Sequence, residues 1–68
     1  MQTEKVQAWQ VDPGDSILLG GDVFNVADKS DETEAITFYG YWEDEAQQKE
    51  ISRHPYDEIE VIVSFDDD

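Results

Sequence analysis

The sequence of 68 residues contains no cysteine, two prolines and only four lysines and arginines. Without cysteine the chain has neither a disulfide framework nor a thiolate metal site. Its apolar runs are only a few residues long, whereas a membrane-spanning helix needs roughly 20 apolar residues. The first residues are polar and do not resemble a signal peptide. We therefore expect a soluble protein of the cytoplasm.

The short length limits the functions that the chain can have. A domain near this size buries only about 60% of the surface that its unfolded chain exposes. An ordinary ligand pocket needs about 300–1,000 Å³ inside a rigid shell, which leaves little room for a substrate cleft. We therefore expect one small domain over residues 1–68, with an acidic tail at 66–68 and no enzymatic activity.

The sequence has a large excess of acidic over basic residues. Eighteen Asp and Glu stand against four Lys and Arg, for a formal net charge of -14. This imbalance weakens a small fold by self-repulsion and repels nucleic acid and anionic membranes. It also exceeds the net charge of magnitude about 2–8 that keeps a small domain soluble. We therefore expect a basic protein as partner, such as one that binds DNA or RNA, and no direct contact with nucleic acid or membrane.

High charge and low mean hydropathy are also typical of disordered chains, but here the apolar residues argue for a fold. The sequence has eight aromatic residues, and its Val and Ile alternate with polar residues as they do in strands. The candidate strands span residues 6–11, 16–19, 22–27, 35–42, 50–53 and 58–65. Strong turn signals lie between them, at Asp12-Pro13-Gly14-Asp15 and at Gly20-Gly21.

Two segments do not follow the strand pattern. Residues 28–34 contain no large apolar residue, which predicts a solvated loop. The stretch EDEAQQK at 43–49 has acids first and a lysine last, an order that favours a short helical turn. It has no apolar stripe, so it forms at most a turn or two.

Five or six short strands with tight turns predict an all-β fold, a small antiparallel barrel. The alternation places Thr37, Tyr39 and Tyr41 outward, with Gly40 at a bulge or at a close approach of another backbone. The predicted core residues are Trp9, Ile17, Leu19, Phe24, Val26, Ile36, Phe38, Ile59, Val61 and Val63.

Two parts of the sequence resemble known proteins. The run VDPGDSI at 11–17, followed by Gly20, Gly21, Phe24 and Val26, is similar to the strand–turn–strand opening of SH3-like small barrels. HPYDEIEVI at 54–62, together with TFYG at 37–40, resembles small uncharacterised acidic proteins of actinobacterial phages. The resemblance implies an SH3-like barrel and a phage origin, which would place the chain in the host cytoplasm. It carries no functional residue across.

Motifs for chemistry are weak. Ser52 and His54 lie two residues apart, but the sequence shows neither an orienting acid nor an oxyanion hole. The four acids within 28–34 suit a hard cation only loosely, because the segment lacks the central Gly and the Glu at position twelve of an EF-hand. We therefore expect no catalytic residue, no cofactor and no metal site.

The acids fall into four clusters, at 28–34, 43–45, 57–60 and 66–68. Carboxylates on a rigid barrel can imitate the phosphate charges of nucleic acid, and Glu58 and Glu60 would project together from one strand. Exposed tyrosines are typical anchors of interfaces, and cross-strand pairing within a sheet explains them about as well. The candidate binding residues are Asp28, Asp31, Glu32, Glu34, Tyr39, Tyr41, Trp42, Glu43, Asp44, Glu45, Asp57, Glu58 and Glu60.

The leading hypothesis is a non-enzymatic interaction protein that binds a basic protein, with inhibition by nucleic-acid mimicry as its most specific form. The alternative is a structural or accessory barrel whose acidity serves solubility or assembly. The salt dependence of binding distinguishes these two hypotheses, because a complex driven by charge weakens steeply as ionic strength rises.

The charge imbalance predicts how salt changes stability. Added NaCl, or a few millimolar Mg²⁺, should raise the melting temperature, because counterions screen the repulsion among the carboxylates. Circular dichroism melts across a salt series measure this directly. A melting temperature that stays flat or falls would mean that the acids are already paired or well separated.

Overall fold

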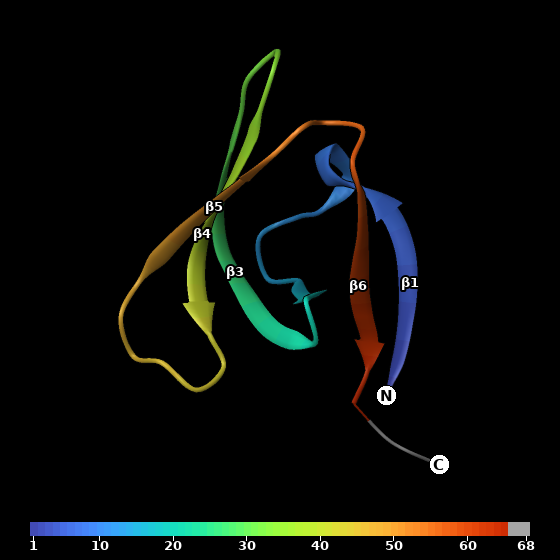
Figure 1. The fold of residues 1–68 in the computed structure, drawn as a ribbon, viewed down its shortest axis with the longest axis vertical. Coiled ribbons are helices and arrows are strands. Elements are labelled where there is room, and N and C mark those ends of the chain that lie inside the picture. The colour runs from blue at the N-terminus through green and yellow to red at the C-terminus, as the bar shows by residue number, and fades with distance from the viewer. Residues whose placement is uncertain (66–68) are drawn as a thin grey trace.

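The computed structural model describes residues 1–65, and strands are the main secondary structure of these residues (Figure 1). The six strands are β1 (Gln2–Gln7), β2 (Ser16–Leu19), β3 (Asp22–Asp31), β4 (Ile36–Trp42), β5 (Lys49–Arg53) and β6 (Glu58–Ser64), with a 3-10 turn at Ala8–Gln10. Their pairings are antiparallel. The expected all-β fold of short antiparallel strands is confirmed. The predicted acidic tail at 66–68 lies outside the described residues.

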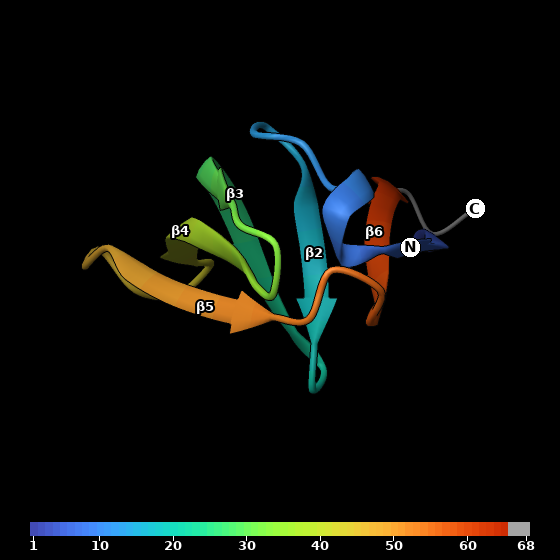
Figure 2. The same cartoon turned by 90° about the horizontal axis from the view of Figure 1, so that it is seen from above.

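The strands make one sheet in the order β1-β6-β2-β3-β4-β5. The sheet bends around the core like a small barrel but does not close, so β1 and β5 are its two edges (Figure 2). The predicted Gly20-Gly21 turn closes the β2–β3 hairpin, in which Leu19 pairs with Asp22. Both glycines have positive φ, 59° and 88°, as a two-residue hairpin turn requires. Within residues 1–65, no helix has the length and apolar character needed to cross a membrane.

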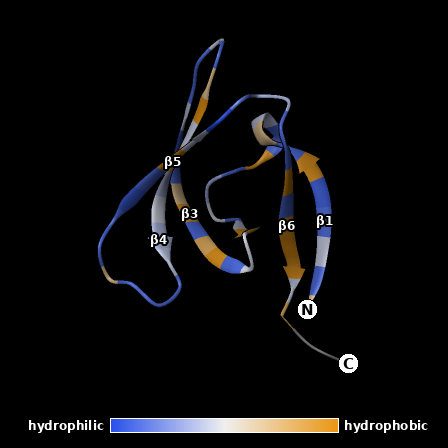
Figure 3. Ribbon diagram, in the orientation of Figure 1, coloured by the Kyte–Doolittle hydropathy of each residue, from blue (hydrophilic) through white to orange (hydrophobic). Residues whose placement is uncertain are grey.

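The concave side of the bent sheet holds the core. Its largest fully buried side chains are Phe24, Phe38, Ile17 and Val11. The hydrophobic residues of β3 lie within 23–27, whereas edge strand β5 and the loop before it are mostly hydrophilic (Figure 3). Of the predicted core, Leu19 and Val61 are only partly buried and pack against the rest.

The prediction of Trp9 as a core residue is wrong. β1 begins at Gln2 and ends at Gln7, and the 3-10 turn takes the place of the predicted strand at 8–10. Residues three apart lie on the same side of a 3-10 turn. Ala8 and Val11 are therefore the fully buried residues, while Trp9 is 48% exposed.

The prediction of Val63 as a core residue is also wrong, since it is 56% exposed. The register between β1 and β6 skips it, because Gln2 pairs with Ser64 and Thr3 with Ile62. An extra residue of this kind is a β-bulge, which breaks the alternation of faces. Ile62 is buried instead.

The helical turn allowed for 43–49 does not form. Residues 43–48 make turns and irregular backbone, and β5 begins at Lys49. The segment is too short to nucleate a helix, and it has no apolar face that a helix could bury.

A bulge at Ala27 divides β3 into two parts. Val26 pairs with Gly40 and Asp28 pairs with Tyr39, so Ala27 has no partner of its own. The extra residue moves Lys29 to the inner face, opposite buried Phe38, and extends the strand to Asp31. The predicted loop at 28–34 is therefore wrong for its first four residues, because a bulge allows pairing to continue past the break in alternation.

Gly40 lies where the backbones of β3 and β4 approach closely. A Cβ built at this position would overlap the backbone carbonyl oxygen of Asn25 and would lie 3.1 Å from the nitrogen of Ala27. The expectation of a bulge or a close backbone approach at Gly40 is confirmed.

Replacing Gly40 with Ala should lower the free energy of unfolding by about 1–3 kcal/mol, the usual cost of forcing atoms into a packed site. Urea unfolding followed by fluorescence measures the change. Ser30→Ala, also on the β3–β4 pair, is the control and should unfold close to the parent. Equal stability of Gly40→Ala and the parent would show that the two strands can separate at the bulge without cost.

Candidate functional site

Two surfaces combine aromatic rings with carboxylates. The first, here called the Tyr39 row, consists of Asp28, Tyr39 and Glu50, which are direct cross-strand neighbours on β3, β4 and β5. The second, here called the Trp9 groove, is a hollow at one end of the fold. Its lining residues are Gln7, Trp9, Asp31, Glu32, Thr33, Ile36, Pro55 and Tyr56.

The Tyr39 row lies on the outer face of the sheet. Ile36, Phe38 and Gly40 of β4 are buried, so the alternating Thr37, Tyr39 and Tyr41 face outward, as predicted. Tyr39 is half-buried between its two acidic neighbours, and Tyr41 is 39% exposed. The bulge thus gives the outer face a phenol flanked on both sides by carboxylates.

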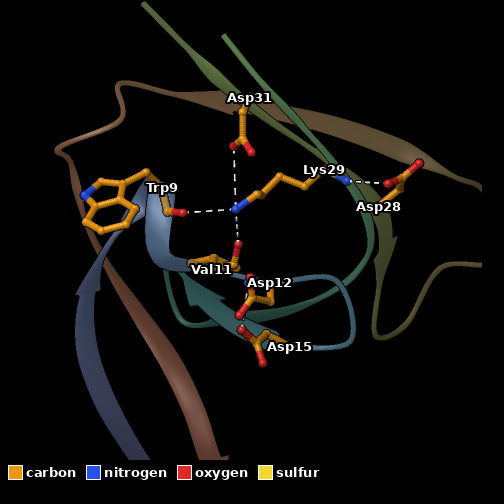
Figure 4. Close-up of polar contacts among 7 residues, drawn as sticks. All are labelled: Trp9, Val11, Asp12, Asp15, Asp28, Lys29 and Asp31. Atoms are coloured by element: carbon orange, nitrogen blue, oxygen red, sulfur yellow. Dashed lines mark hydrogen bonds and ion pairs between the residues drawn. The ribbon is translucent and has the colours of Figure 1, made fainter. Parts of the chain in front are cut away.

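Lys29 fixes the other surface from inside. Its side chain is only 10% exposed, and its Nζ donates to the carbonyl oxygens of Trp9, at 3.0 Å, and Val11, at 2.7 Å (Figure 4). The same Nζ lies 3.5 Å from Oδ1 of Asp31. One ammonium group therefore ties the turn after β1 to the end of β3.

The turn that carries Trp9 is also tied to the loop before β6. The backbone N–H of Ala8 donates to the carbonyl of Asp57 at 2.8 Å, and that of Trp9 donates to the carbonyl of Pro55 at 3.1 Å. The indole Nε1–H of Trp9 donates to Oε1 of Gln7 at 2.6 Å. These bonds hold an exposed indole in one position.

The Trp9 groove has a volume of about 450 Å³. Ile36 and Pro55 are buried beneath it, while Trp9 and the 69% exposed Tyr56 stand at its surface. Tyr56 lies in a turn in which its backbone N–H donates to Nδ1 of His54, and the centroids of the two rings lie 5.7 Å apart. Asp31 and Glu32 supply negative charge from the end of β3.

The structure distributes the predicted binding residues over several places. Asp31, Glu32 and Glu34 lie at the β3–β4 hairpin, Asp28, Tyr39 and Tyr41 on the outer face, and Glu43, Asp44 and Glu45 in the β4–β5 loop. This loop lies at the opposite end of the molecule from the hairpin (Figure 1). The sequence clusters thus do not form one continuous site.

Some predicted residues already have partners within the chain. Trp42 packs edge-on against Phe24, with ring centroids 5.1 Å apart, and Asp57 accepts the N–H of His54. On β6, Glu58 lies 3.5 Å from Nζ of Lys5, and Glu60 accepts the hydroxyl of Thr3. These side chains have less freedom to serve a partner than Tyr39 or Glu32.

Sequence reasoning missed Trp9 and Tyr56 as surface aromatics and Lys29 as an anchor. Tyr56 carried a usable signal, because an aromatic residue inside a Pro-Tyr-Asp turn has no strand face on which to be buried. Trp9 and Lys29 carried none, since their orientations depend on the 3-10 turn and on the bulge.

Ser52 and His54, the two residues of the weak Ser–His motif, each bond to a different neighbour. Ser52 Oγ lies 3.0 Å from Oγ1 of Thr37 across β4 and β5, and His54 Nδ1 accepts from Tyr56. Within residues 1–65, no group of three or more acidic or histidine side chains has a geometry for holding a metal ion.

No family model matches the sequence, and the comparisons with curated proteins and with solved structures give no match either.

Lys29→Met should destabilise the fold by about 1–3 kcal/mol, because it removes a charged donor from the carbonyl oxygens of Trp9 and Val11. Lys5→Met is the matched control, as it removes the same charge from an exposed ion pair worth at most about 1 kcal/mol. Chemical denaturation compares the two. If both variants lose equal stability, the effect comes from net charge, and Lys29 does not anchor the Trp9 turn.

Proposed function

We propose that this chain is a non-enzymatic interaction protein that binds a basic protein through its outer face. The observation that carries the proposal is the Tyr39 row, in which a half-buried tyrosine lies between Asp28 and Glu50. An arginine or lysine of a partner can lie over such a ring and bind a neighbouring carboxylate at the same time.

The placement of the cations supports the proposal. Lys29 points inward, and Lys5 pairs with Glu58. On β5, Lys49 and Arg53 alternate with Glu50, so their side chains leave the opposite side of the strand. The outer face around Tyr39 therefore keeps its negative charge, and such a field speeds the encounter with a basic surface.

Nucleic-acid mimicry is the more specific form of the proposal. Asp28 and Glu50 are separated by β4, so their backbones lie about 9–10 Å apart at ordinary strand spacing. A DNA strand carries a charge every roughly 3.4 Å along the axis, so a mimic also needs acids from other elements, such as Glu32 and Glu34. The resemblance to phage proteins would make the partner a host or phage protein that binds DNA or RNA.

The test begins with capture of a basic partner at low salt from a nuclease-treated lysate, followed by binding kinetics. Tyr39→Ala should weaken binding about 10-fold, mainly through a faster off-rate, because buried aromatic anchors carry much of an interface's energy. Asp28→Asn with Glu50→Gln should slow the on-rate and flatten its salt dependence. DNA should compete with the chain for the partner if mimicry is correct.

The matched control is Glu43→Gln with Glu45→Gln, which removes two charges from the β4–β5 loop and leaves Asp28, Tyr39 and Glu50 unchanged. If this control slows association as much as the Asp28 and Glu50 pair, the charge acts generally and the Tyr39 row is not the interface. Failure to capture any basic protein would favour the alternative, an acidity that serves solubility or assembly.

A further inference from the structure

We propose that the Trp9 groove binds an arginine side chain presented by an extended peptide segment. The guanidinium would lie against the rings of Trp9 and Tyr56 and bind the carboxylates of Asp31 and Glu32. This inference goes beyond the proposed function, because the groove is built from the 3-10 turn, the β3–β4 hairpin and the loop before β6, while the Tyr39 row lies on other residues.

The size and the lining of the groove suit a side chain with a hydrophobic stem. Its volume of about 450 Å³ falls within the roughly 300–1,000 Å³ that ligand sites occupy. Its base is apolar, since Ile36 and Pro55 are buried, and two exposed aromatic residues stand beside them. An apolar base binds the aliphatic part of a long side chain, and exposed aromatic rings bind a planar cation.

The aromatic wall is fixed before any ligand arrives. The backbone of the Trp9 turn is bonded to Pro55, to Asp57 and to the ammonium of Lys29. The indole N–H is already donated to Gln7, so Trp9 offers a ligand its ring surface and not its donor. Binding at such a wall costs little conformational entropy, because the ring is ordered in advance.

Charge selects the class of ligand. Asp31 and Glu32 line the groove, and Glu34 lies two residues further along the hairpin. Two cations lie nearby. Lys29 is occupied by two carbonyls as well as by Asp31. Arg53, the cross-strand neighbour of Ile36, is not among the lining residues and donates to the carbonyl of Ser52. The carboxylates would repel an anionic ligand. An apolar ligand would remove water from the carboxylates and offer no hydrogen bond in its place, which costs free energy.

Arginine fits this combination better than lysine. Its planar guanidinium stacks on aromatic rings and donates two parallel hydrogen bonds to a carboxylate, whereas an ammonium is a strongly hydrated point charge. The groove offers both partners that a guanidinium prefers, because aromatic ring faces and carboxylates line the same hollow.

The experiment titrates the full chain with a capped pentapeptide that has one arginine among glycines, and with the same peptide carrying citrulline, which is similar in shape but uncharged. Heteronuclear NMR follows the indole N–H of Trp9, assigned with Trp9→Phe. The arginine peptide should shift this resonance, and the citrulline peptide should bind at least about 10-fold more weakly, because the charge is lost.

Variants locate the site. Tyr56→Ala should weaken the arginine peptide about 5-fold or more, since the lost ring contact is worth about 1 kcal/mol. Its control is Tyr41→Ala, which removes an exposed tyrosine of the outer face and should leave binding unchanged. Glu32→Gln should weaken binding and Glu45→Gln, with the same change in net charge, should not. Tyr56 is mostly exposed, so its variant should fold, and the NMR spectrum checks this.

Three results would overturn the inference: equal binding of both peptides, equal losses for Tyr41→Ala and Tyr56→Ala, or shifts confined to residues outside the groove. A variant with Asp28→Asn and Tyr39→Ala distinguishes this inference from the proposed function. Peptide binding should survive in that variant even if the Tyr39 row proves to be the interface with a basic protein, or proves to have no partner.

Discussion

The close approach of β3 and β4 at Gly40 is the constraint on which the rest of the structure depends. Only a residue without a side chain lets the carbonyl of Asn25 come so near, and the bulge at Ala27 forms there. Because one extra residue exchanges the faces of a strand, the bulge turns Asp28 outward beside Tyr39 and Lys29 inward toward the core. Both candidate surfaces therefore originate at one backbone irregularity.

Lys29 transmits the effect of the bulge to the Trp9 groove. A lysine on the inner face of a small barrel needs acceptors, and the carbonyls of Trp9 and Val11 supply them. The same bonds hold the turn in which Val11 is fully buried while Trp9 stays exposed. The ammonium group of Lys29 thus holds the buried turn residue Val11 in place and also fixes the position of Trp9 in the groove.

The sequence was a good guide where alternation and turn residues agreed, and a poor one where long-range pairing decided the outcome. β2, β4 and β5 follow the predicted ranges within one residue. The first strand was predicted at 6–11, whereas β1 spans Gln2–Gln7. This edge strand is held by its pairing with β6 and has no alternating apolar pattern that the sequence could show. The exposure of Trp9 and the register change at Ala27 had no local signal, although Gly40 marked the right position. The acidic clusters predicted charge but not location, since residues adjacent in sequence separate onto different ends and faces of a bent sheet.

The open sheet has a consequence for how copies of this chain meet one another. Its free edges are β1 and β5, which carry Lys5 and the pair Lys49 and Arg53. Two copies that paired through β5 in antiparallel fashion, centred on Ile51, would set Lys49 of one copy against Arg53 of the other at both ends of the ladder. Like charges directly opposite each other destabilise such a pair, and lysine on an edge strand is a common protection against strand addition. Three of the four cations of this acidic chain thus lie on edge strands, where they oppose self-association and aggregation.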